Sequence, residues 1–248
     1  TQPDNEFFAK AIANRIWAHY LGRGLVEPVD DIRETNPATN EPLMNALSTH
    51  MVDVKFDMRK FTRTLLQSRV YQLGAASNDS NRDDQQNFSH AAYKTIPAEV
   101  LLDAISQTTG VAEKFNGWPE GYRAIQIWDN RMPSYFFRIF GRPVRATVCE
   151  CERSGEPSIS QALHLLNSPE IMAKIQHRDG TARRLANSEL TDDELIDELY
   201  LMTLSRFPKE EERNLMREAF SDSGSERNAA VEDVLWALLN TKEFIFNH

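Results

Sequence analysis

Apolar residues recur at three- and four-residue spacing along most of this 248-residue chain, and each such run starts near a residue that can cap a helix. The first run places Phe8, Ile12 and Ile16 on one side of a helix that Asp4 or Asn5 can cap and that Gly22 and Gly24 can end. Further runs occupy 40–52, 57–68, 97–109, 133–140, 209–221 and 226–240, and two more begin at capping-box pairs opened by Ser158 and Thr191. The pattern predicts an all-α (mainly α) globular domain of about eight helices, in one or two packed bundles.

Two stretches interrupt this pattern. Residues 74–92 are the least hydrophobic part of the chain, and we interpret them either as a surface loop or as a boundary between subdomains 1–73 and 93–248 of one domain, 1–248. Prolines and glycines break the segment 111–157, where strand-like runs occur at 123–128 and 146–149. Loops that a rigid scaffold positions often carry function, so a site is expected in this irregular middle segment.

Charge and motif content exclude several classes of function. A net charge of −9 argues against broad binding of nucleic acid, because such binding needs a positively charged surface. The longest apolar runs, such as 234–239, are far shorter than the roughly 20 residues of a membrane span. The chain has no nucleophile elbow, phosphate-cradling glycine loop or His-Glu-x-x-His motif, and its two cysteines do not form a haem attachment signature. We therefore assign no catalytic residue and no cofactor to it.

The most suggestive cluster of reactive side chains lies at the end of the irregular segment. In an extended backbone Cys149 and Cys151 point to the same side, and with His164 they could bind zinc, although a one-residue spacer is unusual for a zinc site. Buried packing beside a charged network and a strained redox disulfide are the alternatives. The full candidate cluster is Cys149, Glu150, Cys151, Glu152, Arg153 and His164.

A second candidate site is a group of arginines among aromatic residues: Arg138, Arg142 and Arg145. Guanidinium groups hold carboxylates, sulfates or phosphates through paired hydrogen bonds, so a sulfated glycan is one ligand, with Trp118 and Trp128 as exposed stacking surfaces. The alternative is that these arginines anchor the irregular segment to the acidic remainder of the domain.

Two weaker groups lie near the N-terminus. Asp30 and Asp31 could serve acid–base chemistry or bind calcium, but ion pairs with Arg23 or Arg33 are the simpler interpretation. On the first predicted helix, Asn14 and Trp17 cannot easily share a face with His19. Trp17 is therefore predicted to be a core residue rather than part of a site.

Several long motifs resemble one known family. They are residues 14–40, SRVYQL at 68–73, PAEVLLDAISQTTG at 97–110, FGRP at 140–143, CECER at 149–153, QALHLLNS at 161–168 and LLNTKEFIFNH at 238–248. The chain is similar to the planctomycete domain of unknown function that forms the C-terminal part of secreted proteins with an upstream c-type cytochrome domain. The resemblance implies an extracytoplasmic protein whose haem lies only on the upstream domain, and it brings no established catalytic residues.

The leading functional hypothesis is a non-catalytic interaction module that docks on the cytochrome-bearing part of the same protein. The alternatives are an enzyme or a ligand- or metal-binding domain with its site in 111–164, or a sulfated-glycan-binding domain. A docking module should expose an apolar surface, whereas a ligand-binding domain should have a pocket with convergent polar groups.

Overall fold

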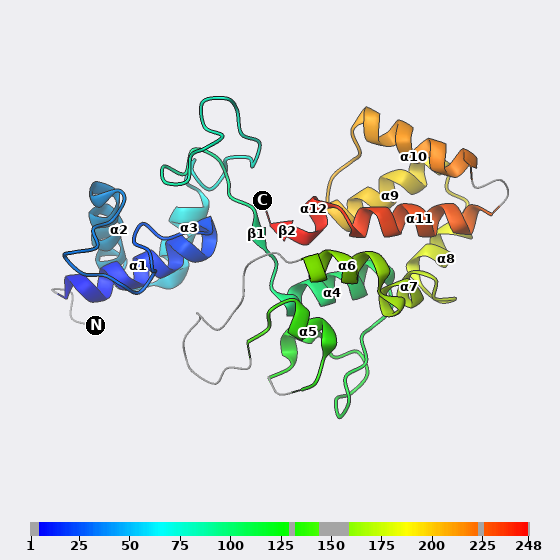
Figure 1. Ribbon diagram of the computed structural model, residues 1–248, viewed down its shortest axis with the longest axis horizontal. Coiled ribbons are helices and arrows are strands. Elements are labelled where there is room, and N and C mark those ends of the chain that lie inside the picture. The colour runs from blue at the N-terminus through cyan, green and yellow to red at the C-terminus, as the bar shows by residue number, and fades with distance from the viewer. Residues whose placement is uncertain (1–4, 129–131, 144–158, 223–225, 248) are drawn as a thin grey trace. The chain divides into compact units, whose positions relative to one another are not determined.

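The computed structural model describes residues 5–128, 132–143, 159–222 and 226–247. These residues form twelve α-helices, one 3₁₀-helix and one pair of two-residue strands (Figure 1), which confirms the predicted all-α fold class. None of the described helices is both long and apolar enough to cross a membrane. The chain divides into two compact units, with the boundary between Lys94 and Thr95.

Unit 1 contains three helices: α1 (Glu6–Leu21), α2 (Glu41–Asp53) and α3 (Met58–Leu66). Each begins where the sequence predicts, because the side chains of Asn5, Asn40 and Asp57 accept hydrogen bonds from the first turn of their helix. α1 ends at Gly22, whose φ of 83° is the left-handed conformation that glycine adopts at no steric cost. The buried core of this unit is Ala13, Trp17, Leu21, Leu25, Val26, Met44, Met51, Phe61 and Leu65.

The long connection from α1 to α2 has no regular structure, but one buried side chain fixes it. Asn14 is completely buried and bonds to the backbone of Leu25, Val26 and Val29. A Cβ atom on Gly24 would clash with the Val26 carbonyl oxygen and lie 3.0 Å from the Asn14 amide, so only glycine fits at this position. The Asn14 amide thus supplies hydrogen bonds to the connection where its backbone enters the core.

Unit 2 contains the remaining helices and is organised around two of them. The elements are α4 (Ala98–Thr109), η1 (Ala124–Gln126), α5 (Tyr135–Ile139), α6 (Ile159–Asn167), α7 (Pro169–Ile175), α8 (Thr181–Ala186), α9 (Asp192–Leu204), α10 (Glu210–Asp222), α11 (Arg227–Leu239) and α12 (Lys242–Ile245). α11 packs against α7, α8, α9, α10 and α12, and α4 packs against η1, α5, α7 and α8. The short strands β1 (Lys94–Thr95) and β2 (Phe246–Asn247) pair with each other.

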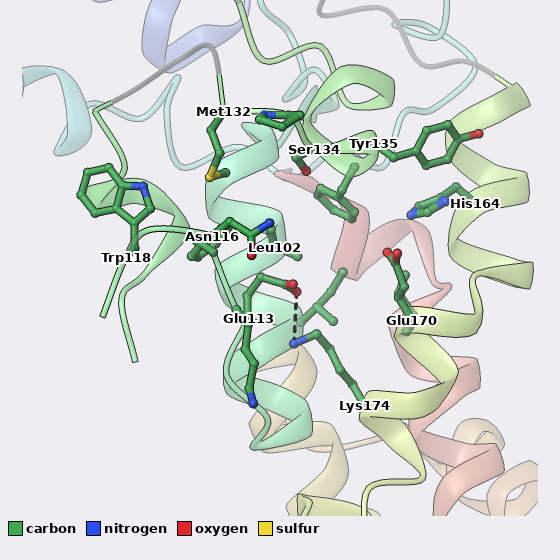
Figure 2. Close-up of a pocket in the computed structure, with 16 residues that line it drawn as sticks. Leu102, Glu113, Asn116, Trp118, Met132, Ser134, Tyr135, His164, Glu170 and Lys174 are labelled. Atoms are coloured by element: carbon green, nitrogen blue, oxygen red, sulfur yellow. Dashed lines mark ion pairs between the residues drawn. The ribbon is translucent and has the colours of Figure 1, made fainter. Parts of the chain in front are cut away.

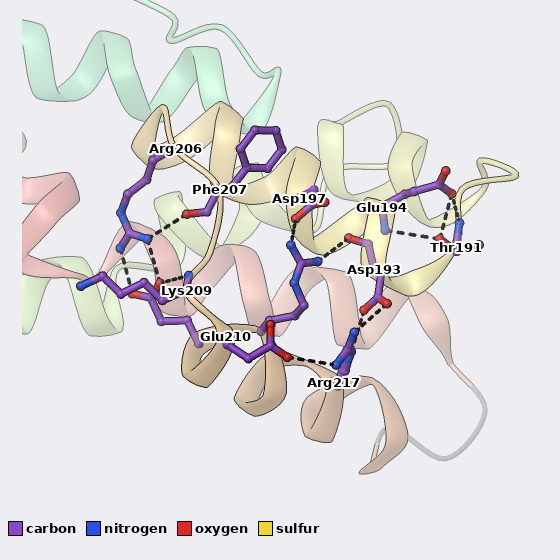
Figure 3. A network of polar contacts seen from close by, with 11 residues as sticks. Thr191, Asp193, Glu194, Asp197, Arg206, Phe207, Lys209, Glu210 and Arg217 are labelled. Carbon is purple, nitrogen blue, oxygen red and sulfur yellow. Dashed lines mark hydrogen bonds and ion pairs between the residues drawn. The ribbon is translucent and has the colours of Figure 1, made fainter.

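Ion pairs fasten the helices at the C-terminal end of unit 2 (Figure 3). Thr191 and Glu194 form the predicted capping box at the start of α9. After α9, Arg206 donates to Glu212 at 2.7 Å and to Glu243 at 2.6 Å, so one guanidinium joins α10 and α12. Arg217 of α10 donates to Asp193 of α9 at 2.7 Å.

The structure corrects three details of the predicted helices and strands. The run 123–128 contains the 3₁₀-helix η1, not a strand: Ala124 and Ile127 are buried three residues apart, and the Asp103 carboxylate accepts from the Ala124 N–H at 2.6 Å. On α6 the sequence pattern predicts that Ala162, Leu163, Leu165 and Leu166 form the apolar face that packs inward, but of these only Leu165 is buried. Helices α7, α8 and α12 were not predicted, because each has seven residues or fewer and too few turns to show a periodic pattern. Ser158 and the run 146–149 lie outside the described residues.

Candidate functional site

Unit 2 contains a pocket of about 410 Å³ beside the irregular middle segment. Residues 113–118 and 132–136 supply much of its wall, and α4, α6 and α7 supply the rest (Figure 2). A pocket of this size is typical of sites for small ligands. Most of its lining residues belong to 111–164, the segment in which the sequence predicts a site, and the others belong to α4 and α7.

One side of the pocket is held in place by a buried lysine. Lys174 of α7 has a side chain only 11% exposed, and its Nζ lies 3.2 Å from a carboxylate oxygen of Glu113. The same nitrogen donates to the Val111 carbonyl at 2.9 Å. These bonds fix the loop that follows α4, and they leave the ammonium charge neutralised and largely unavailable to an anionic ligand.

His164 of α6 lies on the opposite side, among aromatic rings. Its ring centroid is 5.3 Å from that of Tyr135 and 5.7 Å from that of Phe136. Burial lowers the pKa of His164, and the nearby Glu170 carboxylate partly opposes this effect. The imidazole is therefore neutral at neutral pH, and its buried Nε2 has no hydrogen-bond partner in the described part of the chain. In Figure 2 the Glu170 carboxylate points toward this ring.

Aromatic side chains continue from the pocket to the surface. Trp118 is half-buried and lines the pocket. Its ring centroid lies 5.8 Å from that of Trp128, which is 78% exposed, and 5.3 Å from that of Tyr122. The three rings are inclined to one another by 72° and 43°, so they form a bent rather than a flat apolar surface.

Of the predicted arginine group, the structure describes two members, which have different surroundings. Arg142 is only 4% exposed, with Nε 3.3 Å from a Glu99 carboxylate oxygen, and it donates to the Ile127 carbonyl at 2.5 Å. These are the contacts of an anchor. Arg138 is exposed, with its guanidinium carbon 5.1 Å from the ring centre of Tyr135. Arg145 lies outside the described residues.

Of the predicted cysteine cluster, only His164 lies within the described residues, and it lines the pocket. Cys149, Glu150, Cys151, Glu152 and Arg153 lie outside them. Among the residues that the structure describes, no group of three or more histidine, cysteine, aspartate or glutamate side chains could hold a metal ion.

The acidic pair in unit 1 takes part in ion pairs. Asp31 pairs with Arg33 at 3.0 Å, one of the two partners suggested by the sequence. Asp30 instead pairs with Arg15 of α1 at 2.5 Å, and this bond lowers the pKa of Asp30. Arg23 donates to the Gln85 carbonyl. Both carboxylates thus help to hold the connection between α1 and α2.

Four charged residues of the pocket were missed by sequence reasoning: Glu113, Lys114, Glu170 and Lys174. The sequence does contain one indication that Lys174 is buried. It lies between apolar residues in a short run that starts at the capping residue Ser168. A lysine at a position facing the core requires a buried partner, but the sequence does not say which residue that partner is.

Comparison with known proteins identifies a family whose description names no activity. The model of the PSD1 family, described as a protein of unknown function (DUF1553), matches residues 1–220. No curated protein and no solved structure matches the chain.

Proposed function

The chain belongs to the PSD1 family (DUF1553), and we propose that it is a carbohydrate-binding domain whose site is the pocket of unit 2. The observation that carries this proposal is the continuity of the pocket with exposed aromatic rings. Trp118 lines the pocket and contacts Trp128, which is 78% exposed. A large exposed indole costs solvation free energy, and a ligand that stacks on it recovers that cost.

The composition of the pocket suits a sugar. The C–H faces of a pyranose ring pack on aromatic side chains, while its hydroxyl groups donate to carboxylates and accept from amides. Asn116, Ser134 and Glu170 supply such polar groups in the wall of the same pocket. Since the three aromatic rings form a bent surface, a single flexible saccharide chain fits better than the flat face of a crystalline polymer.

The charged residues that the structure describes in and beside this pocket favour a neutral sugar over a sulfated one. Lys174 is paired with Glu113, and Arg142 is buried in its contacts with Glu99 and Ile127. Neither cation is free to hold a sulfate group. Of the other charges in the wall, Glu170 is negative and Lys114, which is exposed and lies 3.6 Å from Glu120, is positive. The wall therefore has no net positive charge that would attract a sulfated ligand.

Calorimetric titration with neutral hexasaccharides of glucose, xylose and mannose, and with a sulfated glycosaminoglycan hexasaccharide, tests the proposal. We expect saturable binding of at least one neutral sugar, and loss of about ten-fold or more in affinity for Trp118→Ala and Trp128→Ala. Phe207→Ala is the matched control, because Phe207 is 62% exposed in the same unit and does not line the pocket. Binding that all three variants retain, or no binding of any sugar, would contradict the proposal.

A second candidate function, docking on an upstream cytochrome-bearing part of the same protein, rests on helix α6. Ile159, Leu163 and Leu166 recur at four- and three-residue spacing and are 80%, 54% and 40% exposed. They form an apolar stripe on one side of this helix. The resemblance to planctomycete proteins supplies the partner and an extracytoplasmic location, with haem on the partner and none on this domain.

This second proposal is tested by calorimetry between the chain and the separately expressed upstream part. We expect binding that changes little with salt, since the surface is apolar. Leu163→Glu should abolish it, whereas Leu215→Glu, at an equally exposed leucine of α10, should not. Binding that survives Leu163→Glu would exclude α6 as the contact surface.

A further inference from the structure

We propose that unit 1 contains a second binding site, which takes a small, mostly apolar molecule carrying one hydrogen-bond acceptor. The site is a pocket of about 420 Å³ among α1, α2, α3 and the segments 39–40 and 86–88. At the roughly 30 Å³ that a water molecule occupies in the liquid, this is room for about a dozen non-hydrogen atoms. The proposal concerns unit 1 alone and is independent of the carbohydrate site.

The wall of this pocket is mainly hydrocarbon. Leu25, Leu43, Leu47, Phe61 and Val70 line it. Water gains few hydrogen bonds in such surroundings, so an apolar molecule of matching size would displace it favourably.

One donor in this wall is unused. Trp17 lines the pocket and is only 3% exposed, and its indole Nε1 is buried with no hydrogen-bond partner in the part of the chain that the structure describes. The nearest aromatic ring, Phe88, stands perpendicular to it with centroids 5.2 Å apart. A ring is a much weaker acceptor than an oxygen atom. A buried donor without a partner is unfavourable, so a ligand that brings an acceptor should bind more tightly than one that does not.

The hydroxyl groups of the wall are already committed elsewhere. Thr39 donates to the Leu25 carbonyl at 3.2 Å, and Ser68 donates to the Leu65 carbonyl at 2.6 Å. Thr64 donates to the Lys60 carbonyl at 3.2 Å and lies 3.0 Å from His50 Nε2. The amides of Asn40, Gln86 and Asn87 also line the pocket, but these residues are exposed to solvent. The indole N–H of Trp17 is therefore the buried donor from which we infer the ligand class.

The test uses the whole chain labelled with ¹⁵N and two probes of equal shape, cyclohexanone and its hydrocarbon isostere methylenecyclohexane. The indole N–H signal of Trp17 is assigned by its absence in Trp17→Phe. Cyclohexanone should shift this signal downfield in a saturable way. The hydrocarbon should bind roughly three- to ten-fold more weakly and give no downfield shift, because it lacks the acceptor.

A matched pair of variants on α2 locates the site. Leu47→Phe should fill the pocket and abolish the shift, whereas Ala46→Phe, at the exposed neighbouring position, should leave it unchanged. If Leu47→Phe does not fold, Leu43→Phe replaces it. The proposal is overturned if cyclohexanone leaves the Trp17 signal in place, if both probes bind equally, or if the filled variant responds like the native chain. None of these outcomes bears on sugar binding by unit 2.

Discussion

Asn14 and Val26 are twelve residues apart, and the amide of one bonds to both backbone groups of the other. Asn14 Nδ2 donates to the Val26 carbonyl at 2.9 Å, and Asn14 Oδ1 accepts from the Val26 N–H at 3.1 Å. The same amide donates to the Val29 carbonyl and accepts from the Leu25 N–H, both at 2.8 Å. Its two donors and its carbonyl oxygen are thus fully used. A single side chain of α1 thereby holds the connection to α2.

Asn14→Ala should therefore destabilise the chain by about 2–4 kcal/mol, because it leaves several buried backbone groups unpaired. Urea unfolding followed by circular dichroism measures the change. Asn45→Ala, at an exposed position of α2, is the control and should change the stability by less than about 0.5 kcal/mol. Equal effects of the two substitutions would show that Asn14 has no special role.

The start and end of α1 could be predicted from the sequence, whereas the role of Asn14 could not. Asn5 and Gly22 act on backbone groups within a few residues of themselves, so the local sequence contains the whole interaction. Asn14 acts on a segment that begins eleven residues further on. Helical periodicity places it on one face with Trp17, but it does not identify the backbone groups that the amide meets.

The same difference in sequence separation explains what could be predicted of the pocket. The sequence indicates an irregular segment with His164 on the predicted helix that follows it, and His164 does line the pocket. The ion pair between Glu113 and Lys174 joins residues about sixty positions apart. No local pattern predicts such a pair, because it depends on how α7 packs against α4.

The contact between Arg206 and Glu212 predicts how stability depends on pH. Hydrogen bonds from Arg206 lower the pKa of Glu212 from 4.5 to about 2. The unfolded chain then binds more protons than the folded chain between these two values. The stabilisation is therefore complete above about pH 5 and is lost as the pH falls toward 2.

Glu212→Gln should lower the free energy of unfolding by about 1–2 kcal/mol at pH 7, an amount reduced by partial solvent exposure of the pair. The difference from the native chain should shrink as the pH falls from 5 to 2.5. Urea unfolding at several pH values measures it. Glu211→Gln is the control, because Glu211 is an exposed neighbour on the same helix. A difference that stays constant with pH would mean that the ion pair is not its source.

The titration of His164 tests the electrostatics of the unit 2 pocket. Burial lowers its pKa below the usual 6.5, while Glu170 raises it in part. An NMR titration of the imidazole protons should give a midpoint below 6.5. Glu170→Gln should move the midpoint lower still, because it removes the compensating charge. An unchanged or higher midpoint in Glu170→Gln would place Glu170 too far from the ring to act on it.

Lys174→Met should destabilise the chain by about 2–4 kcal/mol, because it leaves the Val111 carbonyl and the Glu113 carboxylate without their buried cation. Lys114→Met, at a side chain 85% exposed beside the same pocket, should cost less than about 0.5 kcal/mol.

The contribution of Glu113 to this loss of stability is measured with the double variant that combines Glu113→Gln with Lys174→Met. If the ion pair is the main interaction, the double variant should lose less stability than the two single losses added together, by at least about 1 kcal/mol in urea unfolding. Strict additivity would mean that Lys174 acts through the Val111 carbonyl alone. The loop after α4 would then be held by its backbone, and the charge of Glu113 would be free to face a ligand in the pocket.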